Sequence, residues 1–536
     1  MNRAGKTTIC LLFLLTILFN FHAPALAQDT VVDEVRSLLE TSYVDPVSGE
    51  VLDAPTVEEM LELLGDPYTT YFTAEEYQDF TNSLDRIFSG IGIYIDIVPE
   101  GVLVISVIEG SPGEEAGLRP GDIIVEADGR NMAGLSVEEA VTILRGPEGS
   151  AVELVVSRSE DIFSITVIRK TIVVPTVTGE VLDGHIGYID IDSFGLNTPG
   201  AFGDIVNELK DEHVDGWIVD LRDNPGGYLD SALDIAGYFV GSDIALQIRG
   251  RSGATVLYRA AEHSFIINQP VIFLVNEYSA SASEILAAAV KDHEKATLVG
   301  TGTYGKGTVQ SVYTLSDGGR LKMTVARFYS PKGSEINEVG VAPDLVMREL
   351  DSLQAAKLLL GSSGEKEDNT GFIQFKSGPN TFEIDLDAAR SAEYWPVYKE
   401  ILNSASKSSE LKIGTGSGWK EVTVEPERNW LLFYPDHGYL GELNEVPVDK
   451  VFKIRFSGKV DWRTVNKESV ELIDIETGER VPVNFQPVSD RVVEAIPGEY
   501  LKPGAAYWLV IHDAVRGVNG TRLKQGVLVR VKVGSE

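Results

Sequence analysis

The sequence predicts a multidomain α+β protein, because three kinds of secondary-structure pattern follow one another along its 536 residues. Apolar residues at helical spacing come first and predict a small helical segment over residues 28–84. Buried strands then alternate with amphipathic helices over residues 173–350, which is typical of an α/β core. Short strands separated by turns recur over residues 422–536. Hydrophobic residues make up 43% of the chain, enough for several separate cores.

Residues Met1 to Ala27 have the features of a secretory signal. The cations Arg3 and Lys6 precede an apolar run, and small residues before the end of the segment suit a cleavage site. The apolar run is too short to span a membrane. We therefore expect an exported protein that works in the cell envelope or outside the cell. The sole cysteine, Cys10, would leave with the signal, so the mature chain would have no disulfide and no thiol nucleophile.

Charge and histidine content narrow the function classes. The formal net charge of −35 argues against a nucleic-acid partner and favours a soluble, self-repelling surface. The seven histidines are scattered without metal-ligand spacing, so we expect no metal and no cofactor. His293 falls in a predicted helix and is interpreted as a structural residue. Asp220 and Asp223 end a predicted strand with no histidine beside them, and are interpreted as turn and cap residues.

The stretch from Asn276 to Gln310 combines a strand-to-helix turn with a lysine between two glycines. An apolar run over residues 271–275 predicts a buried strand, and residues 284–291 predict a helix. The serines of the turn lie between these elements: Ser279, Ser281 and Ser283. A serine at such a turn is well placed for nucleophilic attack, because the next backbone N–H points to where an oxyanion would form. Lys306 is the better candidate base than His293, since a desolvated lysine loses its charge.

Three interpretations of this stretch stay open on local sequence alone. The first is a serine-rich turn that caps a helix, with a surface lysine in a loop. The second is a phosphate-binding loop, because Gly300 and Gly305-Lys306 have nearly the required spacing. That motif needs Ser or Thr next, where this chain has Gly307, and residues 308–313 predict a strand instead of a helix. The third is a hydrolase with a serine nucleophile and a lysine base.

The run SASASE, a helix ending in KDH, a strand and then TYGKGTVQ resemble the core of the carboxy-terminal processing peptidases. The resemblance covers residues 31–347. It implies a nucleophile, a general base and a residue that orients the base amine: Ser281, Lys306 and Gln310. The family usually has two glycines before the serine triplet, where this chain has Glu277 and Tyr278. We therefore expect a different turn geometry beside the nucleophile.

The same resemblance implies a crotonase-like α/β peptidase core over residues 173–350. A buried strand there ends in the turn Asn-Pro-Gly-Gly, whose glycines let backbone amides approach a substrate. One oxyanion donor would be the N–H of Gly226 or Gly227, and the other the N–H of Ala282. The alternative for this turn is an ordinary tight turn. The N-terminal segment would pack on another subunit and make a homo-oligomer, or would only cap the core.

Residues 85–172 resemble the PDZ module inserted in these peptidases. The matching features are a carboxylate-binding loop, the run AGLRPGD and a helix over residues 137–144. The loop residues are Gly90, Ile91, Gly92 and Ile93. An extended peptide would pair with the strand after the loop, and loop N–H groups would bind its terminal carboxylate. Arg145 corresponds to a family arginine that links PDZ position to the active site; its alternative is a surface ion pair.

The remaining chain lies outside the usual peptidase architecture. Residues 351–421 combine linkers, over 361–370 and 404–417, with a strand and a helix of no assigned function. Residues 422–536 resemble bacterial Ig-like envelope domains, which implies a β-sandwich that binds a cell-envelope component or acts as a spacer.

The sequence therefore predicts an exported serine endopeptidase. Its partners would be protein or peptide substrates with exposed C-termini, recognised through their tails by the PDZ module. The alternative is a non-catalytic envelope scaffold that binds partners through the PDZ and Ig-like modules.

Overall fold

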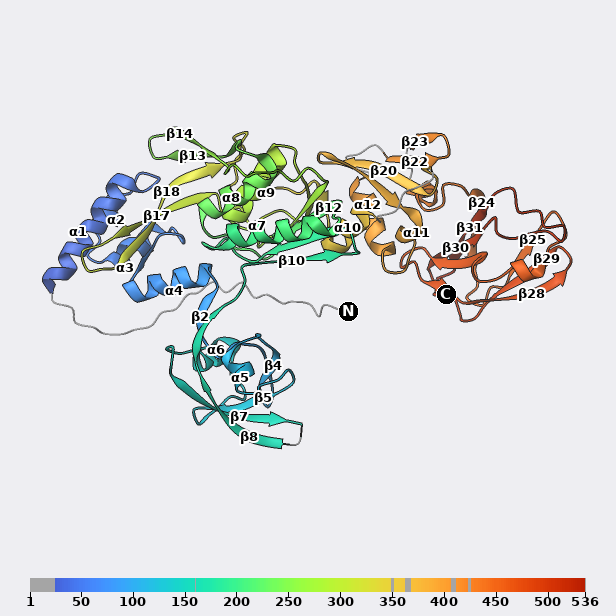
Figure 1. Cartoon of the computed structure of the whole chain (residues 1–536). Helices are drawn as coiled ribbons and strands as arrows, with labels where there is room; N and C mark the ends of the chain where they lie inside the picture. Colours follow the sequence, from blue (N-terminus) through green and yellow to red (C-terminus); the bar gives the residue numbers. More distant parts are fainter. Residues whose placement is uncertain are drawn as a thin grey trace.

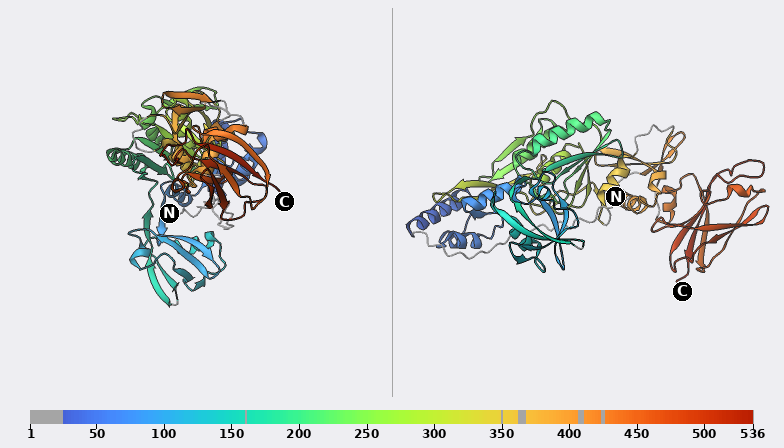
Figure 2. Two further views of the ribbon diagram at one scale, coloured as in Figure 1. Left: turned by 90° about the vertical axis from the view of Figure 1, so that its right-hand side faces the viewer. Right: turned by 60° about the horizontal axis from the view of Figure 1, so that its bottom comes forward.

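The computed structural model of the chain describes residues 25–159, 161–348, 351–361, 368–405, 411–422 and 426–535. Figure 1 shows the N-terminal helices, the core, a smaller α/β unit and the C-terminal strands in a row, with the 85–172 module projecting below the core. The left-hand view of Figure 2 shows the same projection. The predicted signal segment falls almost entirely outside the described residues. None of the described helices is long and apolar enough to cross a membrane.

The N-terminal segment packs against the core through one strand. Its elements are α1 (Ala25–Ser42), α2 (Gly49–Leu52), α3 (Val57–Leu64), β1 (Thr70–Phe72) and α4 (Ala74–Leu84). The sequence predicted helices separated by residues 71–72, but these residues belong to β1, which pairs antiparallel with β18 (Arg320–Tyr329). Val35, Leu39 and Met60 are buried with Leu321 and Met323 of β18. The segment is therefore joined to the core by a sheet as well as by apolar packing.

The 85–172 module is a six-stranded antiparallel sheet closed by two short helices. Its elements are β3 (Ile93–Val98), β4 (Gly101–Val107), α5 (Pro112–Glu115), β5 (Ile123–Ala127), β6 (Arg130–Asn131), α6 (Val137–Leu144), β7 (Ala151–Arg158) and β8 (Asp161–Ile168). The helix predicted over residues 137–144 is confirmed. A stem of two antiparallel strands, β2 (Ile87–Gly90) and β9 (Lys170–Val173), joins the module to the rest of the chain.

The core is built on a six-stranded sheet in the order β10-β11-β12-β15-β16-β19, antiparallel only between the first two strands. These strands are β10 (Val177–Leu182), β11 (Ile186–Ile191), β12 (Gly216–Asp220), β15 (Val271–Val275), β16 (Thr297–Gly300) and β19 (Leu345–Val346). β12 and β15 are buried along their whole length, as expected for parallel strands covered on both faces. The α/β core predicted from the sequence is confirmed.

Alternate side chains of the sheet enter two different apolar cores. Val219 and Phe273 pack with three helices on one face. These helices are α7 (Thr198–Leu209), α8 (Leu229–Val240) and α9 (Ala282–Asp292). Ile218 and Ile272 pack on the other face against α10 (Ser352–Leu360) and the unit that follows. A second sheet in the order β1-β18-β13-β14 covers one end of the core, and β17 (Thr308–Thr314) also pairs with β18. Its other two strands are β13 (Ile244–Gly250) and β14 (Thr255–Arg259).

Residues 368–422 form a small unit of their own. Its elements are β20 (Phe372–Ser377), β21 (Asn380–Asp385), α11 (Leu386–Ala389), α12 (Trp395–Ala405), β22 (Leu411–Thr415) and β23 (Gly418–Val422). The prediction of a linker over residues 404–417 is wrong for β22. Ile413 is paired with Ile373 of β20, and Leu411 is buried, so two apolar residues in a polar stretch hold this strand in the sheet. Most of the other predicted linker, 361–370, lies outside the described residues.

The C-terminal strands form two sheets around one core. The larger has the order β24-β31-β30-β26-β27 and the smaller β25-β29-β28. The strands are β24 (Gly438–Val446), β25 (Phe452–Arg455), β26 (Val470–Asp474), β27 (Arg480–Val481), β28 (Val483–Ser489), β29 (Val492–Pro497), β30 (Ala506–Ile511) and β31 (Val527–Val533). Phe452 and Val493 of the smaller sheet are buried with Leu472, Leu509 and Val531 of the larger. Two sheets facing across a shared core are the arrangement of a sandwich.

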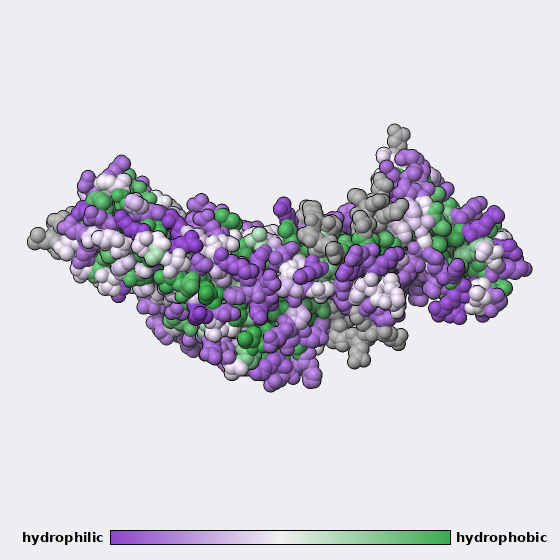
Figure 3. Space-filling view, turned by 90° about the horizontal axis from the view of Figure 1, so that it is seen from above, coloured by the Kyte–Doolittle hydropathy of each residue, from purple (hydrophilic) through white to green (hydrophobic). Residues whose placement is uncertain are grey.

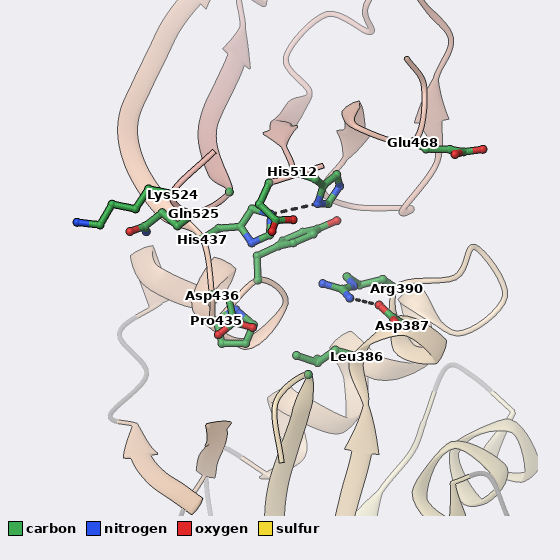
Figure 4. A pocket seen from close by; sticks show the side chains of 14 residues that line it. Leu386, Asp387, Arg390, Pro435, Asp436, His437, Glu468, His512, Lys524 and Gln525 are labelled. Carbon is green, nitrogen blue, oxygen red and sulfur yellow. Dashed lines mark hydrogen bonds and ion pairs between the residues drawn. The ribbon is translucent and has the colours of Figure 1, made fainter. Parts of the chain in front are cut away.

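An aromatic joint connects the 368–422 unit to the C-terminal sheets. The Trp395 ring lies 4.6 Å from that of Phe433 and 5.7 Å from that of Trp508, and its Nε1 donates to the Ile475 carbonyl at 3.0 Å. Beside the joint is a cavity of about 450 Å³ lined by both units (Figure 4). None of its lining residues comes from the peptidase core. The face drawn in Figure 3 is mainly hydrophilic, in keeping with the net charge.

Candidate active site

Ser281 lies between β15 and α9 in a backbone conformation that few serines adopt. Its φ is 56° and its ψ −110°, in the positive-φ region that costs free energy for a residue with a Cβ. The neighbouring serines hold the turn: Ser279 Oγ donates to the Leu221 carbonyl at 2.7 Å, and Ser283 Oγ to the Asn224 carbonyl at 3.0 Å. Ser281 is partly exposed whereas Ala282 and Ser283 are buried. The turn therefore presents one serine to the surface.

The buried carboxylate of Glu284 joins this turn to the lysine loop. Oε2 accepts the backbone N–H groups of Ser281 and Lys306, both at 2.8 Å. Oε1 accepts the Thr303 hydroxyl and the Gly305 N–H, both at 2.6 Å. The Glu284 side chain is fully buried. One carboxylate thus holds the predicted nucleophile and the predicted base next to each other, although 25 positions separate them in sequence.

Two opposing influences act on the protonation of Glu284. Burial is the larger and raises the pKa of the carboxyl, while the hydrogen bonds from Thr303, Gly305, Ser281 and Lys306 lower it. All four partners donate to the carboxyl oxygens, and a carboxylate accepts hydrogen bonds whereas a carboxylic acid must also donate one. The ionised form therefore matches this set of donors.

Lys306 depends on the glycine on each side. Gly305 has a φ of 92°, and a Cβ at Gly307 would come 2.3 Å from the Asn337 nitrogen. Lys306 Nζ lies 4.7 Å from the centroid of the Tyr68 ring, so the N-terminal segment covers the amine. Burial lowers the pKa of Lys306, and the carboxylates of Glu284 and Asp66 act in the opposite direction. The amine is therefore easier to deprotonate than a lysine in water.

Gln310 lies on β17 near the lysine loop. Its Nε2 donates to Thr308 Oγ1 at 2.9 Å and to Thr324 Oγ1 at 3.3 Å. Since both contacts occupy the amide nitrogen, the side-chain carbonyl oxygen is the group left to accept from an amine. The role of orienting Lys306 stays a prediction.

The Asn-Pro-Gly-Gly turn lies directly against Ser281. A Cβ at Gly226 would come 2.9 Å from both the Ala282 nitrogen and Ser281 Cβ, and the Gly226 φ is 103°. The Gly226 N–H donates to Asn224 Oδ1 at 2.8 Å. Within the part of the chain that the structure describes, the Gly227 N–H has no such acceptor. Both predicted sources of oxyanion donors therefore meet beside the serine.

The carboxylate-binding loop predicted at residues 90–93 lies at an edge of its sheet. The carbonyls of Ile91 and Gly92 accept the N–H groups of Gly113 at 2.7 Å and Ile108 at 3.0 Å, which fixes the loop. Among the strands that the structure describes, β3 pairs only with β4, which leaves its other edge for an added strand. Arg145, at the end of α6, stacks its guanidinium 4.8 Å from the ring centroid of Phe88 in the stem strand β2.

Several supporting residues escaped the sequence analysis. Asn224 is fully buried, and its side-chain Nδ2 donates to the Ile191 carbonyl at 2.7 Å. The backbone carbonyl of Asn224 accepts the Ala280 N–H at 3.0 Å. Glu284 follows the serine by three positions, as in a capping box, which is a signal that the sequence does contain. His293 Nε2 donates to the Ile244 carbonyl at 2.7 Å, a structural contact. The described residues contain no group of three His, Cys, Asp or Glu able to hold a metal ion.

Comparison with known proteins agrees with this geometry. Residues 185–347 match Peptidase family S41, and residues 103–158 match the PDZ domain. Carboxy-terminal processing protease CtpA of Bacillus subtilis is 30% identical over 398 residues, which span 73% of this chain and 84% of that protein. The chain belongs to the carboxy-terminal processing protease family. It is thus a serine-type peptidase of family S41 with a PDZ domain.

Other carboxy-terminal processing proteases are similar to a smaller share of the chain. CtpB of Bacillus subtilis is 33% identical over 63% of this chain and 73% of that protein. The protease of Bartonella bacilliformis is 34% identical over 59% of this chain and 74% of that protein. Among solved structures, photosystem II D1 C-terminal processing protease is 27% identical with a TM-score of 0.40, over 60% of this chain and 93% of that chain.

Proposed function

We propose that this carboxy-terminal processing protease is an endopeptidase with a Ser281–Lys306 dyad, acting on proteins whose C-terminal tails bind to its PDZ domain. The observation that carries the proposal is the Glu284 carboxylate, which binds the backbone N–H groups of both dyad residues. Nothing in a binding scaffold requires a strained serine, a half-buried lysine and a glycine-lined surface in one place.

In the proposed reaction, neutral Lys306 takes the Ser281 proton as the hydroxyl oxygen attacks the peptide carbonyl. The same amine then protonates the leaving nitrogen, and a water attacks the acyl-enzyme with Lys306 again as base. The described hydrogen bonds do not include one between Ser281 Oγ and Lys306 Nζ, and the amine lies against Tyr68. The reaction therefore requires the lysine side chain to turn from the tyrosine ring towards the serine.

The oxyanion would be held by the Ala282 N–H and by the Asn-Pro-Gly-Gly turn. Gly226 already donates its N–H to Asn224, so Gly227 is the glycine whose N–H is left for the substrate. Gly226 contributes by lacking a side chain where the substrate carbonyl must approach. Gln310 would hold the lysine amine through its side-chain carbonyl oxygen.

The remaining assignments extend the proposal beyond the site. The N-terminal charge and apolar pattern supports export to the cell envelope or beyond. The two facing C-terminal sheets support an Ig-like module that binds an envelope component or acts as a spacer. The contact of Arg145 with the stem residue Phe88 supports a role for this arginine in linking the position of the PDZ domain to the active site.

The dyad is tested by incubating an unstructured polypeptide with the purified protein and reading the products by mass spectrometry. We expect cleavage by the wild type and by Lys295→Ala, which alters an exposed lysine, and no cleavage by Ser281→Ala or Lys306→Ala. Circular dichroism would show whether the variants fold. Cleavage by either dyad variant at the wild-type rate would refute the assignment, and a folded wild type that binds but never cleaves would favour the scaffold.

The pH dependence gives a second readout. Because burial lowers the pKa of Lys306 from 10.5, activity should rise with pH and level off below that value as the amine loses its proton. A sharp optimum in acid would be incompatible with a lysine base.

A further inference from the structure

The cavity between the 368–422 unit and the C-terminal sheets is separate from the proposed peptidase site. Its volume of about 450 Å³ falls in the range of roughly 300–1,000 Å³ that is usual for ligand pockets. Arg390, which follows α11, lines the cavity from one unit, and His437 and His512 line it from the other (Figure 4). The two units therefore build the cavity together.

Tyr434 in the cavity wall has a buried hydroxyl group without a hydrogen bond. Only 1% of the residue is exposed, and the part of the chain that the structure describes offers its Oη no partner. The ring is fixed on two sides: Arg390 Cζ lies 4.9 Å from its centroid, and the ring of Trp508, from the aromatic joint, lies 5.9 Å away. Since an unsatisfied buried hydroxyl costs free energy, this group favours a polar molecule in the cavity.

His437 supplies a second polar atom of this kind. Glu471 Oε2 lies 2.8 Å from His512 Nε2, and a carboxylate can only accept, so that nitrogen carries hydrogen. With both rings neutral, His512 Nδ1 accepts the hydrogen of His437 Nε2 at 3.2 Å, and His437 Nδ1 is left as an acceptor. His437 Nδ1 is buried and has no partner among the described residues. The cavity therefore offers an acceptor that needs a donor.

The surroundings of His437 disfavour a cation at this end of the cavity. Burial, then the charges of His512 and Arg390, lowers the pKa of His437 to about 4, against the carboxylates of Asp513 and Glu471. Arg390 is held close by, since its guanidinium lies over the Tyr434 ring. A ligand cation would meet the same burial and the same positive charge.

The other charged groups of the cavity disfavour an anion. The described lining residues include two cations, Arg390 and Lys524, and four carboxylates: Asp387, Asp436, Glu468 and Asp513. Arg390 is already paired with Asp387. The carboxylates are therefore in excess, and a negatively charged ligand would be repelled. What both ends accept is a neutral ligand with hydrogen-bonding groups.

We propose that this cavity binds a neutral saccharide, one hydroxyl of which donates to His437 Nδ1 while another bonds with the Tyr434 hydroxyl. A sugar hydroxyl both donates and accepts, so it suits an imidazole acceptor, a phenol and the carboxylates around them. A peptide fits less well, because peptide sites use an open strand edge or apolar pockets. Leu386 and Pro435 are the only aliphatic side chains among the described lining residues. The site goes beyond the proposed peptidase function and does not depend on it.

Removing the Tyr434 hydroxyl separates a binding role from a structural one. Tyr434→Phe keeps the packed ring, and the lost hydroxyl has no partner in the fold, so the thermal midpoint should stay the same or rise. Saccharide affinity should fall about tenfold, because the ligand loses a buried hydrogen bond. Tyr500→Phe is the matched control, since Tyr500 is 78% exposed, and it should change neither quantity.

Binding is measured by calorimetry on the full chain carrying Ser281→Ala, so that cleavage plays no part. The saccharide probes are glucose, galactose, N-acetylglucosamine and the disaccharides of glucose and of N-acetylglucosamine. Inorganic phosphate, 1,4-diaminobutane and an uncharged blocked tetrapeptide test the anionic, cationic and peptide alternatives. We expect at least one saccharide to bind with a Kd of about 1 mM or lower, and the other three probes not to bind.

Imidazole ¹⁵N NMR then locates the bound ligand. The His437 Nδ1 resonance, assigned by its loss in His437→Phe, should shift when the saccharide is added, because a hydroxyl donates to that nitrogen. Failure of every saccharide to bind would overturn the proposal. Equal saccharide affinity in Tyr434→Phe and Tyr500→Phe, or an unmoved His437 Nδ1 resonance, would overturn it as well. Displacement of the saccharide by phosphate, diamine or peptide would assign the cavity to that class of ligand instead.

Discussion

Replacing Glu284 by Gln tests the central feature of the site. The carboxylate accepts four hydrogen bonds in a fully buried position, and an amide offers only one oxygen. The less costly orientation turns the new NH₂ towards Thr303, whose hydroxyl can accept, and leaves the Gly305 N–H without an acceptor. Loss of the charged acceptor and one orphaned buried donor should destabilise the protein by about 2–4 kcal/mol.

The same substitution should lower kcat/KM by more than the loss of folding stability alone would explain. Ser281 and Lys306 would no longer share a charged acceptor, and a misplacement of about 1 Å costs roughly 100-fold in rate. The assay combines urea denaturation with kcat/KM on an unstructured polypeptide. Glu277→Gln is the matched control, because Glu277 is exposed and its carboxylate accepts the Thr301 hydroxyl at 2.8 Å. A Glu284→Gln enzyme as stable and as active as this control would refute the reasoning.

Three further outcomes follow from other parts of the chain. Gly226→Ala should lower kcat by about 100-fold or more, because the new Cβ would clash with Ser281. Gly302→Ala is the control, since Gly302 has open space around it, and equal rates for the two variants would contradict the close contact between Gly226 and Ser281. Burial, then the charges of His512 and Arg390, lowers the pKa of His437 from 6.5 to about 4, so the folded protein should lose stability as pH falls from about 6.5 towards 4. Discounted for partial exposure, this amounts to about 1–2 kcal/mol, and His437→Phe should flatten the acid slope of urea midpoints. Trp395→Ala should lower the free energy of unfolding by about 3–5 kcal/mol, because it removes the central ring of the aromatic joint. Limited proteolysis should then release the C-terminal unit, and an unchanged digestion pattern would argue against the joint.

The two residues of the proposed dyad could be singled out in the sequence because the patterns that mark them are local. The serine triplet and the glycine-flanked lysine are short motifs, and the buried run over residues 271–275 places the serine at a strand end. Glu284 was overlooked although it stands three positions after the serine. Its hydrogen bonds to the backbone N–H groups of Gly305 and Lys306 depend on a loop that is distant in sequence. A capping pattern in the sequence shows that Glu284 can bind the N-terminus of its own helix, but not which other loop donates hydrogen bonds to the same carboxylate.

The contact between the N-terminal segment and Lys306 could not be predicted from any local pattern. It depends on pairing of Thr70 with Lys322, two residues about 250 positions apart, and a three-residue strand has almost no periodicity of its own. The error at β22 has another cause. The stretch over residues 404–417 is rich in Ser, Gly and Lys, and that composition outweighed the alternation of Leu411 and Ile413.

The stem that carries the PDZ domain has a consequence for how such proteases diversify. The chain leaves and returns at adjacent points, since the Val174 N–H donates to the Arg86 carbonyl at 3.1 Å immediately beside the paired strands. An insertion with neighbouring ends can be removed, lengthened or exchanged while the flanking polypeptide keeps its path. The PDZ domain, which selects the substrate tail, can therefore be exchanged without altering the peptidase core. A different binding domain grafted between residues 86 and 174 would change which substrates the protease recognises.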